Sequence, residues 1–242
     1  MIIDSLANIQ VKYWASLSQT KNRQKSGQFL VEGDHLVQEA YRGQAIDLIL
    51  LSVGRNNPYP ELKSVVLSAN IFKKLSQLES QGSIMALCHK QKSSPILGTR
   101  LILCDRIQDP GNLGTIIRTA TAFGFDGVVC SLDCVDFTNE KVIRATQGAL
   151  FHITLEQKDL FEMIRLCHQS GFKVLGTALE DADALSGINS FTPLAIVLGN
   201  EGSGVSKEIL NMCDQKIMIE STAFESLNVA VACGIVCHHF RK

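Results

Sequence analysis

The sequence has no apolar run long enough to cross a bilayer, and its N-terminus lacks the apolar region of a signal peptide. Apolar stretches such as Leu194–Leu198 are far shorter than the roughly 20 residues of a transmembrane helix. The sequence also has no Cys-x-x-Cys pair, which argues against a zinc ribbon. We therefore expect a soluble, cytoplasmic protein that does not associate with a membrane.

The eight cysteines lie mostly inside apolar segments, where a free cysteine behaves as a small hydrophobic residue. The spacing of Cys233, Cys237 and His238 would allow them to share a helix face as metal ligands. The surrounding segment has the composition of a buried core, so we expect no metal.

Charge is distributed unevenly along the chain. The formal net charge is −1 over 242 residues, but residues 1–100 carry +5 and residues 101–242 carry −6. In the first part Lys12, Lys21, Arg23 and Lys25 cluster among Gln, Asn and Ser, a composition that suits phosphate contacts through counterion release. A solvated surface has the same composition, so charge alone leaves RNA binding and an ordinary exposed face both open.

Strand and helix patterns alternate in two parts of the chain, which predicts an α/β fold. Residues 89–98 interrupt the periodicity with a Gln-Lys-Ser-Ser-Pro run and are predicted to be a linker. The predicted domains are therefore 1–88 and 99–242. In the first domain we expect strands at 29–32, 47–52, 64–67 and 83–88, and helices at 35–41 and 70–77.

The second domain alternates more regularly, which is typical of a mainly parallel sheet covered by helices. Ligands of such sheets bind at the carboxyl ends of the strands, so the loops that follow the strands are the places to look for a site. The expected strands are 101–104, 127–130, 152–155, 173–177, 194–198 and 216–219.

The first notable loop follows strand 101–104 and leads through Pro110-Gly111 into a helix expected to start near Asn112, a good capping residue. Arg118 lies inside this helix between residues suited to burial. It is either a charge on the exposed face or an anchor for an anion, and spacing alone favours the exposed face.

The second notable loop is Gly199-Asn200-Glu201-Gly202-Ser203-Gly204, between an apolar strand and a helix expected at 206–211. Its glycines allow close approach of a ligand to the backbone, and the helix N-terminus offers free N–H groups. The loop has neither Walker nor GxGxxG order, so a tight turn and a functional site both remain possible.

The third loop leads from strand 216–219 past Ser226 into a helix that is apolar on nearly every side. Such a helix needs burial from two directions, which favours a second subunit. Ser226 and Asn228 stand at the helix start, where they can cap it or face a ligand.

Together, these loops resemble a known family. The patterns Asn112-x-Gly114-x-x-x-Arg118-x-Ala120, Gly199-Asn200-Glu201-Gly202-x-Gly204 and Ser226-Leu227-Asn228-Val229-x-Val231-Ala232 are similar, in order and spacing, to the signature motifs of SpoU (TrmH-type) RNA ribose 2′-O-methyltransferases. Residues 1–88 resemble the L30e-like substrate-binding domain of the ribosomal-RNA branch. One departure is Ala230, where the family often has serine.

The resemblance implies a trefoil knot in the second domain and transfer of a methyl group from S-adenosylmethionine to a ribose 2′-hydroxyl, most readily of ribosomal RNA. It also implies a homodimer in which Arg118 of one subunit works beside the cofactor of the other. The implied catalytic residues are Asn112, Arg118, Glu201, Ser226 and Asn228, and the implied cofactor-binding residues are Thr177, Gly199, Met218, Ile219 and Leu227.

A guanidinium stays protonated in proteins, so we expect Arg118 to clamp the RNA and lower the hydroxyl pKa rather than to act as a base. Glu201 is expected to orient that arginine or to accept hydrogen bonds from loop amides. The alternatives are a tRNA 2′-O-methyltransferase and a catalytically silent RNA-binding module. The separate first domain argues against the former, and the intact motifs argue against the latter.

Overall fold

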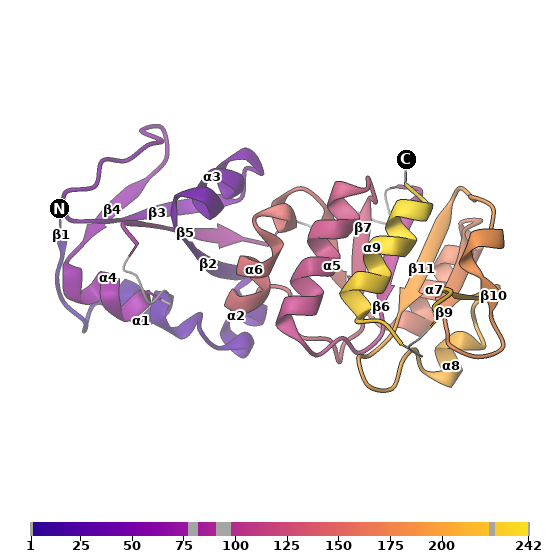
Figure 1. Ribbon diagram of the computed structural model, residues 1–242. Helices are drawn as coiled ribbons and strands as arrows, with labels where there is room; N and C mark the ends of the chain where they lie inside the picture. Colours follow the sequence, from indigo (N-terminus) through magenta and orange to yellow (C-terminus); the bar gives the residue numbers. More distant parts are fainter. Residues whose placement is uncertain (1, 77–81, 91–97, 223–225, 242) are drawn as a thin grey trace. The chain divides into compact units, whose positions relative to one another are not determined.

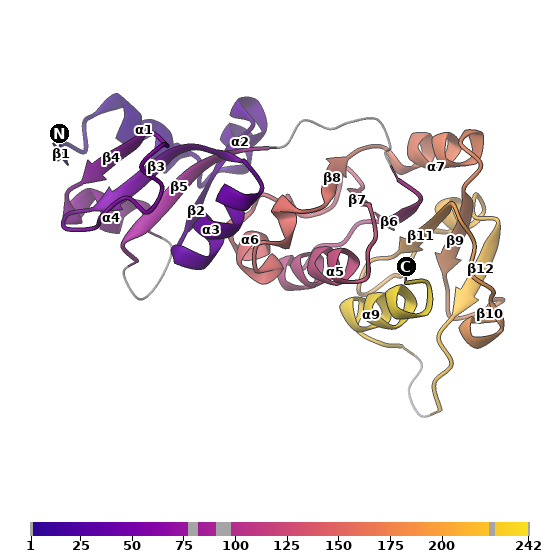
Figure 2. The same cartoon turned by 90° about the horizontal axis from the view of Figure 1, so that it is seen from above.

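The computed structural model describes residues 2–76, 82–90, 98–222 and 226–241. The chain forms two compact units: Met1–Lys92 with Thr138–Phe151, and Ser93–Phe137 with His152–Lys242. Figure 1 and Figure 2 show the elements of each unit. In the described ranges no helix combines the length and apolar composition needed to cross a membrane.

The first unit is built on a mixed five-stranded sheet with the order β1-β4-β3-β5-β2. Leu50, Met85 and Leu87 pack on one face of this sheet beneath α1 and α4, while α3 covers the other face (Figure 1). Its elements are β1 (Ile2–Ile3), α1 (Ile9–Ser16), α2 (Thr20–Ser26), β2 (Gln28–Glu32), α3 (Asp34–Arg42), β3 (Ile46–Ser52), β4 (Ser64–Leu67), α4 (Ala69–Leu75), β5 (Ile84–His89), α6 (Glu140–Thr146) and the 3₁₀ helix η1 (Ala149–Phe151).

The strands and helices predicted for residues 29–88 are all present, with ends shifted by one or two residues. Gln77, the last residue of the predicted helix, lies outside the described residues, as do residues 91–97 of the predicted linker. The patterns did not predict α1 and α2. Only Val11 and Trp14 of α1 are buried, and α2 is polar at every position, so neither helix shows a clear apolar stripe.

Residues 138–151, inside the predicted second domain, pack as part of the first unit. Phe151 stacks on Phe29 with ring centroids 6.2 Å apart, and Gly43 lies so close that a Cβ there would be 2.7 Å from the Cβ of Phe151. The backbone oxygen of Gln147 lies 3.1 Å from Nε2 of His35. The division into domains 1–88 and 99–242 stays a prediction, and experiments are best done on the full chain.

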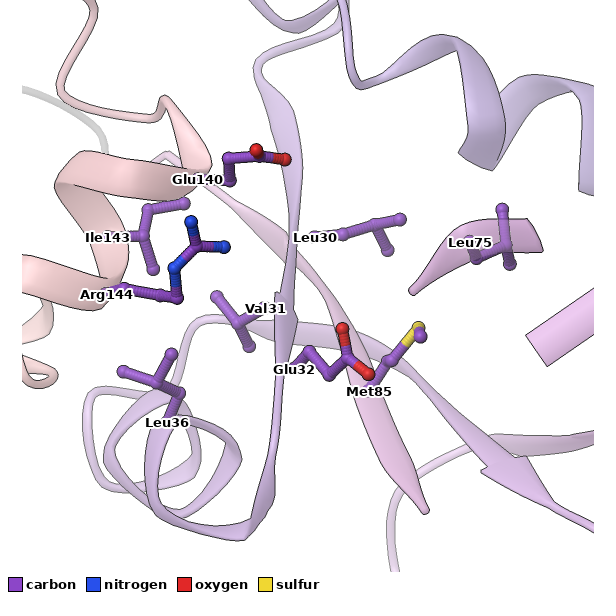
Figure 3. Close-up of a pocket in the computed structure, with 9 residues that line it drawn as sticks. All are labelled: Leu30, Val31, Glu32, Leu36, Leu75, Met85, Glu140, Ile143 and Arg144. Carbon is purple, nitrogen blue, oxygen red and sulfur yellow. The ribbon is translucent and has the colours of Figure 1, made fainter. Parts of the chain in front are cut away.

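A pocket of about 40 Å³ lies beside the edge strand β2. Figure 3 shows Arg144 and Glu140 of α6 beside the apolar side chains of Val31 and Ile143. A volume of this size holds a few water molecules, so the pocket is too small for a nucleotide. Its lining consists of Leu30, Val31, Glu32, Leu36, Leu75, Met85, Glu140, Ile143 and Arg144.

The second unit contains a seven-stranded sheet with the order β10-β12-β9-β11-β6-β7-β8, in which every pairing is parallel. The predicted parallel α/β sheet is confirmed. The largest boundary error is at β8, which begins two residues later than predicted. The strands are β6 (Arg100–Cys104), β7 (Gly127–Cys130), β8 (Thr154–Gln157), β9 (Lys173–Thr177), β10 (Asp183–Ala184), β11 (Leu194–Leu198) and β12 (Gln215–Met218).

Helices cover both faces of this sheet, as Figure 2 shows. One face packs against α7 (Leu160–Gln169) and α8 (Lys207–Leu210). The other carries α5 (Pro110–Ala122) and α9 (Val229–His239), which contact each other. A 3₁₀ helix, η2 (Leu185–Gly187), completes the described elements. The trefoil knot stays a prediction.

The start of α5 differs from the expectation. Asp109, not Asn112, is the N-cap, since its Oδ1 accepts a hydrogen bond from the Asn112 backbone N–H at 2.8 Å. Pro110 takes the first helical position, where its missing N–H has no cost. This cap frees the side chain of Asn112 for other contacts.

Candidate functional site

Three loops meet at the carboxyl end of the second sheet. They follow β6, β11 and β12, and the strand order brings these strands close together with β9 between β11 and β12. Residues 223–225, in the third loop, lie outside the described residues. Hydrogen bonds connect the described parts of the three loops.

One line of hydrogen bonds joins Glu201, Asn112 and Asn228. The Nδ2 of Asn112 donates to Oε1 of Glu201 at 3.1 Å, and its Oδ1 accepts from Nδ2 of Asn228 at 3.0 Å. The Oδ1 of Asn228 accepts from the backbone N–H groups of Ala230 and Val231, so Asn228 caps α9, which is one of the two roles that the sequence left open. One polar residue from each predicted motif therefore belongs to one network.

The Glu201 carboxylate lies at the N-terminus of α5. It accepts hydrogen bonds from the backbone N–H groups of Gln108 at 3.3 Å and Asp109 at 3.2 Å. Partial burial raises the pKa of Glu201, but the hydrogen bonds from Asn112 and the loop amides outweigh it, and the pKa is lowered overall. Of the two roles expected for Glu201, the geometry matches acceptance from loop amides.

We predict that Asn112→Ala raises the pKa of Glu201, because it removes the side-chain donor that favours the ionised form. A carboxyl whose folded-state pKa is depressed stabilises the fold above its unfolded-state pKa and loses that contribution as pH falls through the folded value. The pKa is measured from the ¹³C shift of the Glu201 carboxyl during a pH titration. An unchanged midpoint would contradict the assigned hydrogen bond.

The glycine-rich loop is closed by its own backbone. Asn200 and Gly204 exchange hydrogen bonds of 3.1 and 2.9 Å between their backbones, and Oδ1 of Asn200 accepts from the N–H groups of Gly202 and Ser203. A Cβ on Gly199 would lie 2.0 Å from the nitrogen of Val205. The first glycine is thus required by the loop itself, whereas the sequence suggested only close approach of a ligand.

We predict that Gly199→Ala lowers the thermal stability of the full chain, because backbone atoms of Gly204 and Val205 occupy the space for the methyl group. Overpacking of this kind costs about 1–3 kcal/mol or more. Gly202→Ala is the matched control, since its Cβ would meet only Oδ1 of Asn200 at 3.7 Å. Equal melting temperatures of the two variants would contradict this account of the loop.

Asp105 and Arg106 hold the first two loops together, and neither was among the residues predicted for the site. Asp105 is buried, and its Oδ2 accepts from the Ser206 N–H at 2.8 Å. Nε of Arg106 donates to Oδ1 of Asp105 at 3.1 Å, and the backbone oxygen of Arg106 accepts from Nδ2 of Asn200 at 2.8 Å. The sequence did contain a signal for this pair, because two opposite charges directly follow an apolar strand.

Arg118 lies further along α5 than the Glu201–Asn112–Asn228 network. It is six residues beyond Asn112, which is about 9 Å along the helix axis. Its side chain is exposed, and within the described residues no hydrogen bond or ion pair engages the guanidinium. Ser226 is exposed as well. The structure brings Asn112, Glu201 and Asn228 together, but not Arg118.

The residues predicted to hold a cofactor lie at neighbouring strand ends. Thr177 ends β9, and its hydroxyl donates to the Val197 oxygen at 3.0 Å. Gly199 follows β11 directly and Met218 ends β12. Ile219 is half-buried, and Leu227 is exposed just before α9. The arrangement groups backbone atoms and apolar side chains, which suits an aromatic ring with polar edges.

The four basic residues predicted to contact RNA divide into two groups. Lys12, Lys21 and Lys25 are exposed. Arg23 is buried, and its guanidinium donates to backbone oxygens of Leu17 and Ser18, both at 2.9 Å. It also donates to hydroxyls of Thr20 and Thr138. These donors are turned inward, whereas the three lysines face outward.

Cys233, Cys237 and His238 do not converge. The sulfurs of Cys233 and Cys237 lie 3.6 Å apart in the core, while His238 is exposed and packs edge-on against Phe123. Among the described residues no group of three or more His, Cys, Asp or Glu side chains is arranged to hold a metal ion.

Comparison with known proteins defines the class. Residues 99–238 match the SpoU rRNA Methylase family, and residues 8–86 match the MRM3-like substrate binding domain. The chain therefore belongs to the SpoU rRNA methylase family, as the three motifs predicted. The substrate-binding domain predicted before it is also confirmed.

Among its relatives is the 23S rRNA (guanosine(2553)-2'-O)-methyltransferase RlmP of Bacillus subtilis strain 168, 36% identical over 99% of this chain and 98% of that protein. A TrmH-family structure from Porphyromonas gingivalis has 30% identity, a TM-score of 0.87 and 98% coverage of both chains. An AdoMet-bound rRNA methyltransferase from Sinorhizobium meliloti has 25% identity and a TM-score of 0.88, covering 99% of this chain and 96% of that one.

Proposed function

We propose that the protein transfers a methyl group from S-adenosylmethionine to a ribose 2′-hydroxyl of ribosomal RNA. The observation that carries this proposal is the Glu201–Asn112–Asn228 line, which links all three family motifs through hydrogen bonds. The name of the Bacillus subtilis relative, which aligns over nearly the whole chain, supports ribosomal RNA and the 2′-oxygen. We place the activity in the cytoplasm and assign it no metal.

Thr177, Gly199, Met218, Ile219 and Leu227 would hold the cofactor. They lie at the ends of adjacent strands β12, β9 and β11 or just before α9, and a structural neighbour binds AdoMet. When bound, the cofactor would supply a methyl group already activated by sulfonium. The ribose oxygen would form the new bond to the methyl carbon, the electron pair of the carbon–sulfur bond would stay on the sulfur as a neutral thioether, and the hydroxyl proton would pass to solvent.

The protein's own contribution is to place the ribose oxygen in line with that methyl group. Arg118 clamps an RNA phosphate or the ribose and lowers the hydroxyl pKa through its charge. Glu201 and Asn112 fix the glycine-rich loop against the start of α5, and Asn228 fixes the start of α9. Ser226 is exposed and lies two residues before Asn228, the N-cap of α9, and we assign it to the RNA side of the site.

The protein is further proposed to act as a homodimer through the outer surface of α5 and α9. Val231 and Ile235, four residues apart on α9, are 53% and 39% exposed and lie on one side of the helix. Leu227, just before the helix, is 40% exposed and adds to this apolar surface. Val229 and Val236 of the same helix are buried in the chain's own core. Arg118 is exposed on the neighbouring helix, where a second copy could bring its own site to it.

The decisive experiment combines binding with product analysis on the full chain. Calorimetry in the presence of EDTA is expected to show S-adenosylmethionine binding, and radiolabelled methyl groups are expected in 23S rRNA transcribed in vitro. Alkaline hydrolysis leaves a 2′-O-methylated linkage intact and thereby identifies the atom. Transfer to tRNA but not to the transcript would support the tRNA alternative, and RNA binding without transfer would support a silent module.

A further inference from the structure

We infer that the first unit binds RNA through one face, formed by α1, α2 and α4, and that the lysines of this face contact the phosphates. The inference rests on the proposed function and adds the part of the surface that receives the RNA. The basic face consists of Lys12, Lys21, Lys25, Lys73 and Lys74.

The three helices of this face carry charge of one sign. All five lysines are exposed, and α1, α2 and α4 contain no Asp or Glu. Within the described part of the chain none of these lysines forms an ion pair. An array of unpaired cations on one surface attracts a polyanion and gains affinity by releasing its counterions.

The other helices of the unit differ in charge. α3 carries Asp34 and Glu39 with Arg42, and α6 carries Glu140 with Lys141 and Arg144. Arg42 pairs with Glu39 at 2.6 Å, and Asp34 pairs with Arg55. Positive and negative charges largely cancel there, so these helices offer phosphates little attraction.

The core explains how α1 and α4 come to share a face. Trp14 of α1 and Phe72 of α4 are buried in one cluster on the same side of the sheet, and Figure 1 shows both helices on the side opposite α3. Lys73 and Lys74 follow Phe72 directly and are exposed. Val11 and Trp14 of α1 and the large apolar residues of α4 are turned inward, and the lysines of both helices are left on the outside.

α2 is a polar helix held by a single buried side chain. Arg23 donates to the backbone of Leu17 and Ser18 and thereby fixes the helix without apolar packing. Lys21 lies two residues before Arg23 and Lys25 two residues after it. Two residues turn a helix by about 200°, so both lysines lie opposite Arg23, and both are exposed. Because Arg23 is turned inward, the two lysines are presented together on the outer side.

An anionic lipid surface is the other partner that lysines fit, and Ile9, 84% exposed near Lys12, would suit it. Membrane-surface helices need apolar side chains on the outer face beside the cations. α2 has none, and the large apolar residues of α4, namely Ile71, Phe72 and Leu75, are buried. Four of the five lysines of the basic face therefore favour RNA over lipid.

The test compares three double variants of the full chain, each removing two positive charges. Lys21→Gln/Lys25→Gln and Lys73→Gln/Lys74→Gln alter the basic face, while Lys63→Gln/Lys141→Gln removes two exposed lysines elsewhere in the unit. Binding to 23S rRNA transcribed in vitro is measured at several salt concentrations. Each lost phosphate contact removes about 0.7–0.9 from the slope of log affinity against log salt.

We expect the slope to fall by about 1.5 in both basic-face variants and to stay at the wild-type value in the control. The same slope in all three variants and wild type would overturn the inference. So would loss of binding to phosphatidylserine vesicles with an unchanged RNA slope. Methyl transfer by the wild type to the same transcript is scored separately, so failure of the proposed function is distinguishable from failure of the basic face.

Discussion

Arg118→Ala is expected to lower the rate of RNA methylation about 100-fold or more while the dissociation constant for S-adenosylmethionine stays within a factor of two. Loss of one preorganised charged donor at a reacting oxygen has an effect of this size. The side chain is exposed and outside the Glu201–Asn112–Asn228 network, so its removal leaves the cofactor loops intact. Single-turnover methylation and calorimetry measure the two quantities.

Two further variants make this result specific. Arg118→Lys keeps the charge but loses the planar fork, so partial activity is expected if the guanidinium makes bidentate contacts. Arg165→Ala removes another exposed arginine, on α7 over the opposite face of the sheet, and is expected to leave activity unchanged. Parallel loss of cofactor binding and activity in Arg118→Ala would contradict the assignment of this arginine to the RNA.

Local patterns predicted every strand of four or more residues in the two sheets, because apolar runs such as Leu194–Leu198 must be buried whatever surrounds them. These patterns missed the two-residue strands β1 and β10, which are too short to show a period. They failed for α2, whose sequence has no apolar residue. Its buried side chain is an arginine that donates to backbone oxygens of residues 17 and 18 and to the hydroxyl of Thr138. A contact between residues 115 positions apart produces no periodic pattern in the sequence. Arg23 was therefore predicted to be exposed like the lysines beside it.

The candidate site was predictable to the level of its motifs but not of its contacts. Ordered motifs pointed to Asn112, Glu201 and Asn228, while their mutual hydrogen bonds depend on which strands become neighbours. Asp109 displaced Asn112 as the helix cap because Pro110 fixes the first turn. That exchange gives Asn112 its role, since a capping side chain could not have linked two other loops.

Val231→Glu and Ile235→Glu are expected to convert the protein to inactive monomers. An unpaired carboxylate buried in an interface costs about 3–5 kcal/mol, which weakens association by more than about 100-fold. Leu166→Glu is the matched control, because Leu166 on α7 has nearly the same exposure, 40% against 39% for Ile235. For the α9 variants, the molar mass from light scattering and the rate of methylation are expected to fall together. For the control, neither quantity is expected to change.

Mixing two inactive variants tests whether the subunits share their sites. Arg118→Ala and Asn112→Ala homodimers each lack one component at both sites, whereas a mixed dimer that pairs Arg118 of one subunit with Asn112 of the other has one intact site. Equal amounts exchange to about one half mixed dimers, so about a quarter of wild-type activity is expected to return. If Arg118 serves the site of its own chain, every site in the mixture lacks a residue and no activity returns.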